Sequence, residues 1–310
     1  MRSAALHLGL LALLLGLHFV LPAYHHGNVA RVMVLASFAI GYNLLFGYAG
    51  LLSLGHALFF AAGMYGAGMA VQHGGAGAGT ALAAGLVAGA LVSAALAALA
   101  LRTRGVGFMI VTLMFAQAGY LTILQFSEIT GGDEGFVVPQ AGRMLGAIDL
   151  SAPDARYLAA WVLFSICLVL SLALVCAPFG RVLVAIRENE ERVRMLGYDT
   201  LAHKRAAMVL SGTVSAAAGA AYALLFGYVG ASFAEVQYSI LPLLWVLLGG
   251  AGTVLGPFIG TLFMFYLIDL SSAVTTAYML IAGVALVALT LFAPQGLMGE
   301  VRRRLWRGLP

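Results

Sequence analysis

The chain has 310 residues, of which 62% are hydrophobic and only 9% are charged, and its formal net charge is +4. This composition and a mean hydropathy of +1.00 exclude a soluble globular protein and are typical of a protein that crosses a membrane several times. The long runs of Ala, Leu, Val and Gly do not alternate with polar residues, so they indicate transmembrane α-helices rather than a β-barrel. The basic balance does not indicate nucleic-acid binding, because the basic residues lie where membrane topology needs them.

Ten apolar segments of helical length follow one another and form one transmembrane domain over residues 1–310. We expect an all-α polytopic membrane protein of about ten transmembrane helices, or eight if the short eighth and ninth segments form one re-entrant unit. The first segment resembles a signal peptide, but Leu21 suits cleavage poorly, so an uncleaved helix is expected. The segments are Ala4–Leu21, Asn28–Phe46, His56–Val71, Thr80–Leu101, Gly107–Leu124, Tyr157–Cys176, Ala206–Tyr228, Ser239–Gly249, Pro257–Leu270 and Thr275–Phe292.

Basic residues are divided unevenly between the connections. If both termini are cytoplasmic, all but three of the 16 Lys and Arg residues lie on the cytoplasmic side, the exceptions being Arg31, Arg143 and Arg156. This distribution follows the positive-inside rule. It places the charged segment 178–205 in the cytoplasm and the polar connection 125–156 outside.

Two stretches, Gly41–Phe60 and Leu248–Gly260, are interrupted by glycines at positions that we expect inside the bilayer. Both contain a Gly-x-Ala-Gly step followed by a further glycine, a pattern typical of an internal repeat with broken helices. Irregular backbone at membrane depth is tolerated where it is buried in protein or lines a watery cavity, so both stretches are candidates for a translocation path. Close helix packing through small residues is the alternative. The candidate path residues are Asn43, Gly47, Gly50, Ser53, Gly55, His56, Gly249, Gly250, Gly252 and Gly256.

Segment Pro178–Arg205 concentrates charge in an otherwise apolar chain. Its apolar residues recur at helical spacing between charged ones, which predicts a short amphipathic helix that ends near Gly197. Glu188–Arg192 and Glu190–Arg194 are acid-before-base pairs four residues apart, the favoured order on a helix. A solvated cytoplasmic loop is the alternative. The apolar positions are Val182, Ile186, Val193 and Leu196, interrupted by the polar Asn189.

The chain lacks the residue patterns of an enzyme, a metal site or an ATP-binding protein. Ser53 and His56 are close in sequence, but no acidic residue is placed to orient the imidazole for catalysis. The other histidines are scattered without the spacing of metal ligands, and the turn Thr130–Gly135 lacks the alternating carboxylates of a calcium loop. No glycine-rich phosphate loop occurs, and only Asp269 approaches a span, so we expect the driving energy to come from another protein.

Four tracts, spaced along most of the chain, carry a resemblance to a known family. Any one of them alone is a weak signal, but their occurrence together and in this order is specific. They are GYNLLFGYAGLLSLGHALFFAAGMY at Gly41–Tyr65, TGGDEGF at Thr130–Phe136, PFGRVLVAIRENEERVRMLGYD at Pro178–Asp199 and LLGGAGTVLGPFIG at Leu247–Gly260. With these tracts the chain resembles the permease subunits of branched-chain amino acid ABC importers, specifically the second permease of the LIV type.

The resemblance implies a permease subunit of an ATP-driven, binding-protein-dependent importer in the bacterial inner membrane, with no cofactor of its own. The implied partners are a second permease, two cytoplasmic ATPases that bind the ATP, a periplasmic substrate-binding protein and membrane lipid. Branched-chain or other hydrophobic amino acids are the expected substrates, with urea, short amides or aromatic acids as alternatives. An ion-coupled secondary transporter is the alternative from another class.

The resemblance also implies roles for two parts of the chain. Segment 178–205 would contain a coupling helix whose charged side chains face the ATPase while its apolar side chains pack inward. The external connection would contact a partner through its glycine turn. The expected coupling residues are Arg187, Glu188, Glu190, Arg194, Leu196 and Gly197, and the expected external contacts are Thr130, Gly131, Gly132 and Asp133.

Overall fold

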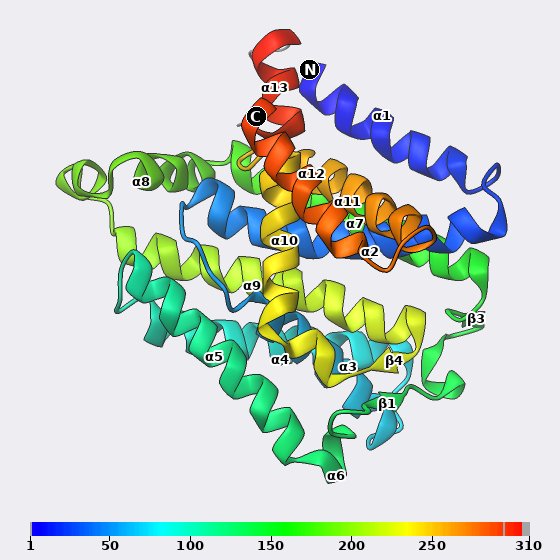
Figure 1. Ribbon diagram of the computed structural model, residues 1–310. Coiled ribbons are helices and arrows are strands. Elements are labelled where there is room, and N and C mark those ends of the chain that lie inside the picture. Colours follow the sequence, from blue (N-terminus) through cyan, green and yellow to red (C-terminus); the bar gives the residue numbers. More distant parts are fainter. Residues whose placement is uncertain (1, 294, 306–310) are drawn as a thin grey trace.

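A computed structural model describes residues 2–293 and 295–305 of the chain, and these residues are mostly helical (Figure 1). Each of the ten apolar segments expected from the sequence coincides with a helix, so the prediction of a helical protein is confirmed. These helices are α1 (Arg2–Leu17), α2 (Ala23–Asn43), α3 (His56–Gln72), α4 (Ala78–Ala100), α5 (Val106–Gln125), α7 (Pro153–Cys176), α9 (Thr200–Phe226), α10 (Val236–Gly249), α11 (Gly256–Ser272) and α12 (Tyr278–Phe292). The others are the short α6 (Ser127–Thr130), the charged α8 (Pro178–Met195) and α13 (Gly296–Leu305).

Among the described residues, five helices are long and apolar enough to cross a membrane, judged by length and composition. The first of them is α2 together with a π-helical turn, Leu44–Tyr48, which extends it to 26 residues. The other four are α4, α5, α7 and α9, and the apolar α10 and α11 are shorter. The protein therefore has the character of a multi-pass membrane protein.

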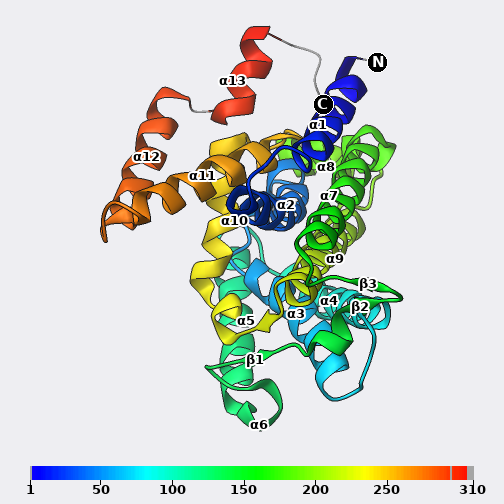
Figure 2. The same ribbon diagram turned by 90° about the vertical axis from the view of Figure 1, so that its right-hand side faces the viewer.

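Helix α9 lies at the centre of the bundle and packs against α2, α3 and α4 (Figures 1 and 2). Small residues make these close approaches possible. A Cβ atom at Gly63 of α3 would clash with the backbone of Ala216, and one at Gly219 of α9 would clash with the carbonyl oxygen of Phe60. Without large side chains at these crossings, dispersion contacts between backbones hold the helices together, as is common in membrane bundles.

Two helix–turn–helix segments contact each other in the fold. Helices α2 and α3 are joined by a turn at residues 49–55, and α10 and α11 are joined by a turn at residues 250–255. Helix α11 packs along α2, so the two segments form one unit, and α12 and α13 follow at its outer edge (Figure 2).

The connection between α6 and α7 is folded onto the end of α9. Its strand β1 (Phe136–Val137) pairs with β4 (Tyr228–Val229), and β2 (Met144–Leu145) pairs with β3 (Ile148–Asp149). In the intervening 3₁₀ turn (Gln140–Arg143), the Arg143 side chain donates two hydrogen bonds of 2.7 Å to the carbonyl oxygens of Leu224 and Leu225. A guanidinium thus caps the C-terminal end of α9, where partial negative charge collects.

Candidate functional site

The two glycine-broken stretches meet in the structure. A Cβ atom at Gly47 would lie 2.5 Å from the backbone nitrogen of Gly252, so the two backbones are in direct contact. Gly50 and Gly252 have φ angles of 71° and 75°, and Gly250 has a φ angle of 115°. Side-chain-bearing residues adopt these conformations at a cost, whereas glycine adopts them freely. The paired interruptions therefore form one structural element.

Asn43 bridges the two stretches. Its Oδ1 atom accepts a hydrogen bond of 3.0 Å from the backbone N–H of Gly252, and its Nδ2 atom donates one of 2.9 Å to the carbonyl oxygen of Thr253. Asn43 is 1% exposed. Backbone polar groups in a non-helical turn need partners when water is excluded. The Asn43 amide supplies a donor and an acceptor to the second turn and ties it to α2.

Arg187 joins the same element from outside the bundle. Its Nη1 atom donates a hydrogen bond to the carbonyl oxygen of Gly47. The Arg187 Cγ atom lies 2.5 Å from the position of a Cβ atom at Gly50, and Nη1 lies 3.1 Å from the position of one at Gly252. The side chain therefore lies against both glycine turns, the Gly-x-Ala-Gly steps at residues 47–50 and 249–252, while the residue as a whole stays exposed; its expected contact with a partner protein stays a prediction.

Helix α8, which carries Arg187, is broken at Asn189. The backbone of Asn189 is extended, with φ −159° and ψ 97°, so two helical pieces meet there. The Asn189 Oδ1 atom accepts a hydrogen bond of 2.9 Å from the backbone N–H of Arg192, which is how a residue caps the start of a helix. The segment that was expected to form one continuous helix therefore forms two helical pieces. Asn189 was the sequence signal for this break, because asparagine commonly caps the start of a helix.

Glu190 fastens the second piece of α8 to the start of α9. Its carboxylate accepts a 2.6 Å bond from Lys204, a 3.1 Å bond from Thr200 and a 3.2 Å bond from Arg194. Partial burial raises the pKa of this carboxyl, but the hydrogen bonds from Lys204 and Thr200, together with the charges of Lys204 and Arg104, outweigh burial and hold the pKa below its ordinary value. The Glu190–Arg194 pair expected from the sequence thus forms, within a larger cluster.

The remaining expected coupling residues lie at the exposed tip of the segment. Val193 is buried as expected, but Leu196 is 71% exposed and the prediction that it packs inward is wrong. Met195 beside it is 86% exposed. The backbone leaves the helix at Gly197 with a φ angle of 88°, as expected of a helix-ending glycine, and Glu188 is exposed. The tip therefore presents apolar side chains to its surroundings.

Ser53 and His56 do not form a hydrogen bond with each other in the described structure. The Ser53 hydroxyl accepts from the backbone N–H of Gly55, while His56 Nε2 lies 2.8 Å from the hydroxyl of Ser211. Ser211 donates to the carbonyl oxygen of Gly41, so Nε2 of His56 carries the proton. Both side chains are fully buried. Their bonds tie α3 to α2 and α9, and no nucleophile is activated.

Several of the candidate path glycines are packing positions. A Cβ atom at Gly249 would clash with the carbonyl oxygen of Gly256, and one at Gly55 would lie 2.6 Å from the carbonyl oxygen of Thr112. Gly256 would bring a Cβ atom to 2.6 Å from the carbonyl oxygen of Gly250. These glycines let the helix backbones touch, which is the alternative that the sequence left open.

The expected external contact residues form a tight turn. The Thr130 hydroxyl donates a 2.6 Å bond to the carbonyl oxygen of Ile123 and accepts one of 3.2 Å from the backbone N–H of Gly132. Gly131 and Gly132 have φ angles of 78° and 60°. Asp133 is exposed on the turn. Thr130 and the glycines therefore shape the turn, and Asp133 is the side chain that it displays.

A groove that no sequence motif indicates lies between α3 and α5. It has a volume of about 400 Å³. Its lining is almost entirely apolar and ends near Thr130 at the external connection. Hydropathy identified α3 and α5 as apolar helices, but it carries no information on where two such helices separate. The lining includes Leu58, Ala62, Tyr65, Met69, Gly119 and Ile123.

Residues 27–292 match the family described as branched-chain amino acid transport system / permease component. The chain belongs to this family. The match covers the glycine turns, α8 and the external connection together, so these features are parts of one family domain. Membership identifies the chain as a transport permease, which accords with the expectation that it is not an enzyme and that ATP hydrolysis belongs to partner subunits.

Curated relatives of the permease carry matching names. A high-affinity branched-chain amino acid transport system permease protein, LivM, of Salmonella typhimurium is 28% identical over 297 residues, covering 88% of this chain and 69% of the relative. Its counterpart in Escherichia coli is 27% identical with the same coverage. A probable LivM of Methanocaldococcus jannaschii is 31% identical over 49% of this chain and 44% of the relative. No solved structure matches the chain.

Proposed function

We propose that this permease forms the membrane path of an ATP-driven, binding-protein-dependent importer of branched-chain or other hydrophobic amino acids. The family assignment and the names of the relatives support the substrate class. The observation that carries the mechanism is the contact of Arg187, on the charged α8, with both glycine turns. A cytoplasmic partner that moves α8 would thereby act on the backbone of the path.

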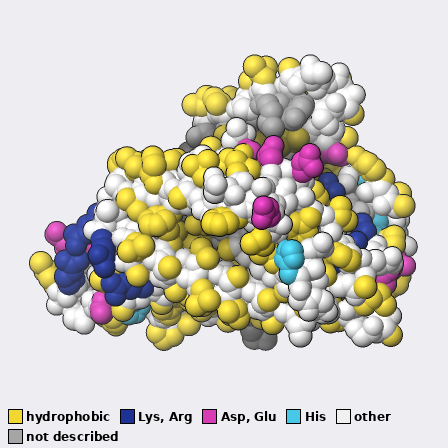
Figure 3. All heavy atoms as spheres, turned by 90° about the horizontal axis from the view of Figure 1, so that it is seen from below, with side chains coloured by type: hydrophobic (Ala, Val, Ile, Leu, Met, Phe, Trp, Pro, Cys, Tyr) yellow, Lys and Arg dark blue, Asp and Glu magenta, His cyan; other side chains and the backbone are white. Residues whose placement is uncertain are grey.

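The bacterial inner membrane is the proposed location, with both termini and α8 in the cytoplasm and about ten transmembrane helices. Lys and Arg side chains gather at the end of the molecule from which α8 projects, while much of the same face is hydrophobic (Figure 3). A hollow of about 470 Å³ at this end is lined by Arg102, Arg104, Arg194 and Lys204, among other residues. This placement follows the positive-inside rule.

The proposed coupling surface is the tip of α8 and the hollow beside it. Met195 and Leu196 are the exposed apolar residues that an ATPase subunit would bury, and such buried apolar anchors dominate the energy of many interfaces. The basic hollow would accept acidic side chains of the same partner. Glu190 holds the tip in place through Lys204 and Thr200, so its proposed role is to shape the surface.

The proposed gate is the junction of the two glycine turns. In the described conformation Asn43 and Arg187 hold the turns together, and no gap of molecular size separates Gly47 from Gly252. A displacement of α8 would withdraw the Arg187 guanidinium and leave the Asn43 bonds as the remaining tie. ATP binding and hydrolysis on the partner can shift this equilibrium only through such differential contacts.

The proposed substrate route uses the apolar groove between α3 and α5, which opens near the external turn. Aliphatic side chains suit a lining of Leu, Ala, Met and Tyr, because burial there removes apolar surface from water. The turn that displays Asp133 is the proposed contact of the extracytoplasmic binding protein, and a second permease would complete the transmembrane assembly.

Reconstitution tests the proposal. Proteoliposomes that contain this chain, a second permease, both ATPases and a loaded binding protein should take up leucine only when ATP is supplied on the ATPase side. Valine and isoleucine should compete with leucine, and urea should not. Leucine uptake by this chain alone, abolished by an ionophore and independent of ATP, would establish an ion-coupled secondary transporter instead.

A further inference from the structure

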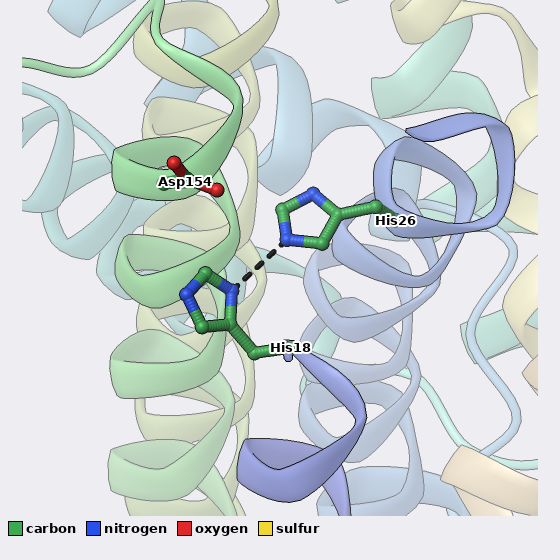
Figure 4. Close-up of side chains that lie close together, drawn as sticks. All are labelled: His18, His26 and Asp154. Atoms are coloured by element: carbon green, nitrogen blue, oxygen red, sulfur yellow. Dashed lines mark hydrogen bonds between the residues drawn. The ribbon is translucent and has the colours of Figure 1, made fainter. Parts of the chain in front are cut away.

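Three side chains with metal-binding atoms converge at the end of the bundle that carries the 125–156 connection (Figure 4). The Nδ1 atom of His18 lies 2.9 Å from the Nε2 atom of His26. The ligand atoms of His18, His26 and Asp154 all lie within 4.8 Å of one another. The three residues come from the turn after α1, from the first turn of α2 and from the first turn of α7. Helix packing alone brings them together.

The scaffold holds these residues in place. The Tyr157 hydroxyl of α7 donates a 2.6 Å hydrogen bond to the carbonyl oxygen of Leu14, and Trp161 donates one of 3.0 Å to that of Leu11. These bonds fix the end of α1 and therefore the position of His18. The Tyr157 ring stacks on the His26 ring, with centroids 4.4 Å apart. A site whose ligands are oriented before binding loses less entropy when it is occupied.

We propose that His18, His26 and Asp154 form a binding site for a divalent cation of the zinc type. Two imidazole nitrogens and one carboxylate oxygen, with water as the fourth ligand, are a common donor set for Zn²⁺. Two nitrogens bound to one tetrahedral zinc ion lie about 3.3 Å apart. The Nδ1 atom of His18 and the Nε2 atom of His26 are 2.9 Å apart in this structure, which is close to that distance. Binding the ion replaces the hydrogen bond, and the ring that donates it changes tautomer, so that its proton moves to its other nitrogen and both rings bind as neutral imidazoles.

The carboxylate distinguishes this arrangement from a simple pair of hydrogen-bonded histidines. The Asp154 side chain is exposed and makes no hydrogen bond or ion pair with any residue for which the structure is described. Figure 4 shows it beside the two rings, where it completes a three-sided set of donors. His25 offers a contrast, since its ring faces the hydroxyl of Tyr266 at 3.3 Å and lies outside the set. Sequence spacing conceals the site, because the ligands are scattered over 137 positions (18–154).

Occupancy would cross-link three helices at one end of the bundle. The ion would join the end of α1 to the starts of α2 and α7, and α2 leads directly into the first glycine turn. A ligand that binds only the folded state stabilises it by an amount that grows with the logarithm of the ligand concentration above Kd. The site is thus a point at which an extracytoplasmic divalent cation stabilises the permease, whether or not the chain transports amino acids.

Metal titration of the purified full chain tests the site. The protein is prepared without a histidine tag, treated with a chelator and titrated with Zn²⁺ by calorimetry and with Co²⁺ by visible absorption, because tetrahedral Co²⁺ has intense bands. The wild type should bind one ion per chain. His18→Gln and His26→Gln should each weaken Zn²⁺ binding by about tenfold or more, and His25→Gln is the matched control that should leave it unchanged.

Asp154→Asn tests the same site in a variant that we expect to fold normally. This exposed, nearly isosteric change should leave the melting temperature of the metal-free protein unaltered while it weakens Zn²⁺ binding and alters the Co²⁺ spectrum. Zn²⁺ should raise the melting temperature of the wild type and of His25→Gln, but not of the three cluster variants. The proposal would be overturned if the wild type showed no stoichiometric binding, or if Asp154→Asn and His26→Gln bound Zn²⁺ as tightly as the wild type does.

Discussion

The contact between Arg187 and Gly47 predicts that this side chain determines how movement of α8 reaches the glycine turns. Within the described residues, Arg187 is the only residue of α8 whose side chain donates a hydrogen bond to a glycine turn. Arg187→Ala removes this bond. Arg187→Lys keeps the positive charge but loses the planar guanidinium. Arg192→Ala is the matched control, because Arg192 is on the same helix and its side chain is exposed.

The magnitude follows from the type of bond. A hydrogen bond from a charged donor contributes about 1.5–3 kcal/mol, and the partial exposure of Arg187 favours the lower end. About 1.5 kcal/mol corresponds to a roughly tenfold change in the equilibrium between conformations that make and lack the bond. Because the bond links α8 to the glycine turns, its loss should lower the number of gate movements per ATP hydrolysed by the same factor.

The assay compares uptake with hydrolysis in the reconstituted importer. Arg187→Ala should lower the leucine taken up per ATP hydrolysed by up to about tenfold, with normal assembly, and Arg187→Lys should fall between it and the wild type. Arg192→Ala should retain the wild-type ratio. Equal ratios for Arg187→Ala and Arg192→Ala would refute the assignment of Arg187 as the link.

Three further predictions concern neighbouring residues. Asn43→Ala leaves the N–H of Gly252 and the carbonyl of Thr253 without partners and should cost about 2–4 kcal/mol of stability, measured by thermal unfolding in detergent; an unchanged melting temperature would show that the bridge is dispensable. Leu196→Asp should leave the permease folded but weaken ATPase binding in pull-downs, whereas the same change at the buried Val193 should impair folding; equal effects would contradict the proposed tip. The pKa of Glu190 is lowered in the folded protein from 4.5, so its stabilising contribution is present above that value and is lost as the pH falls through the lowered pKa. The stability difference between wild type and Glu190→Gln should therefore be present at pH 7 and shrink as the pH falls below 4.5 and through the lowered pKa.

Hydropathy and spacing predicted the helices and much of the site because these signals are local. Ten apolar segments coincide with ten helices, and Gly197 ends its helix as expected. Asn43 was singled out as a polar residue in a broken stretch, but its partners, Gly252 and Thr253, are more than two hundred positions away. A sequence pattern indicates that such a residue needs hydrogen bonds, and only packing decides where they go.

Two features of α8 that helical periodicity did not predict, the directions of Leu196 and Arg187, have separate physical causes. Helical periodicity assumes an unbroken helix, and the extended backbone of Asn189 changes the direction of every side chain after it. Leu196 therefore faces outward although its spacing from Ile186 and Val193 suggested the buried face. Arg187, the second residue before the break, points toward the bundle because its long side chain reaches past the helix surface to Gly47.

Packing and gating need not be separate roles for the glycines of the two turns. Close backbone contact is what keeps water and solute out of the junction in this conformation, since a Cβ atom at Gly47 would clash with the backbone of Gly252, and one at Gly252 would lie only 3.1 Å from the carbonyl oxygen of Gly47. The same absence of side chains means that the turns can separate without withdrawing interdigitated groups, so the barrier to opening lies mainly in the few hydrogen bonds of Asn43 and Arg187. Those bonds are weak enough to exchange for water and specific enough to re-form. The proposed closure, built from glycine backbones and two polar ties, would therefore move with the one helix that a partner protein is proposed to displace.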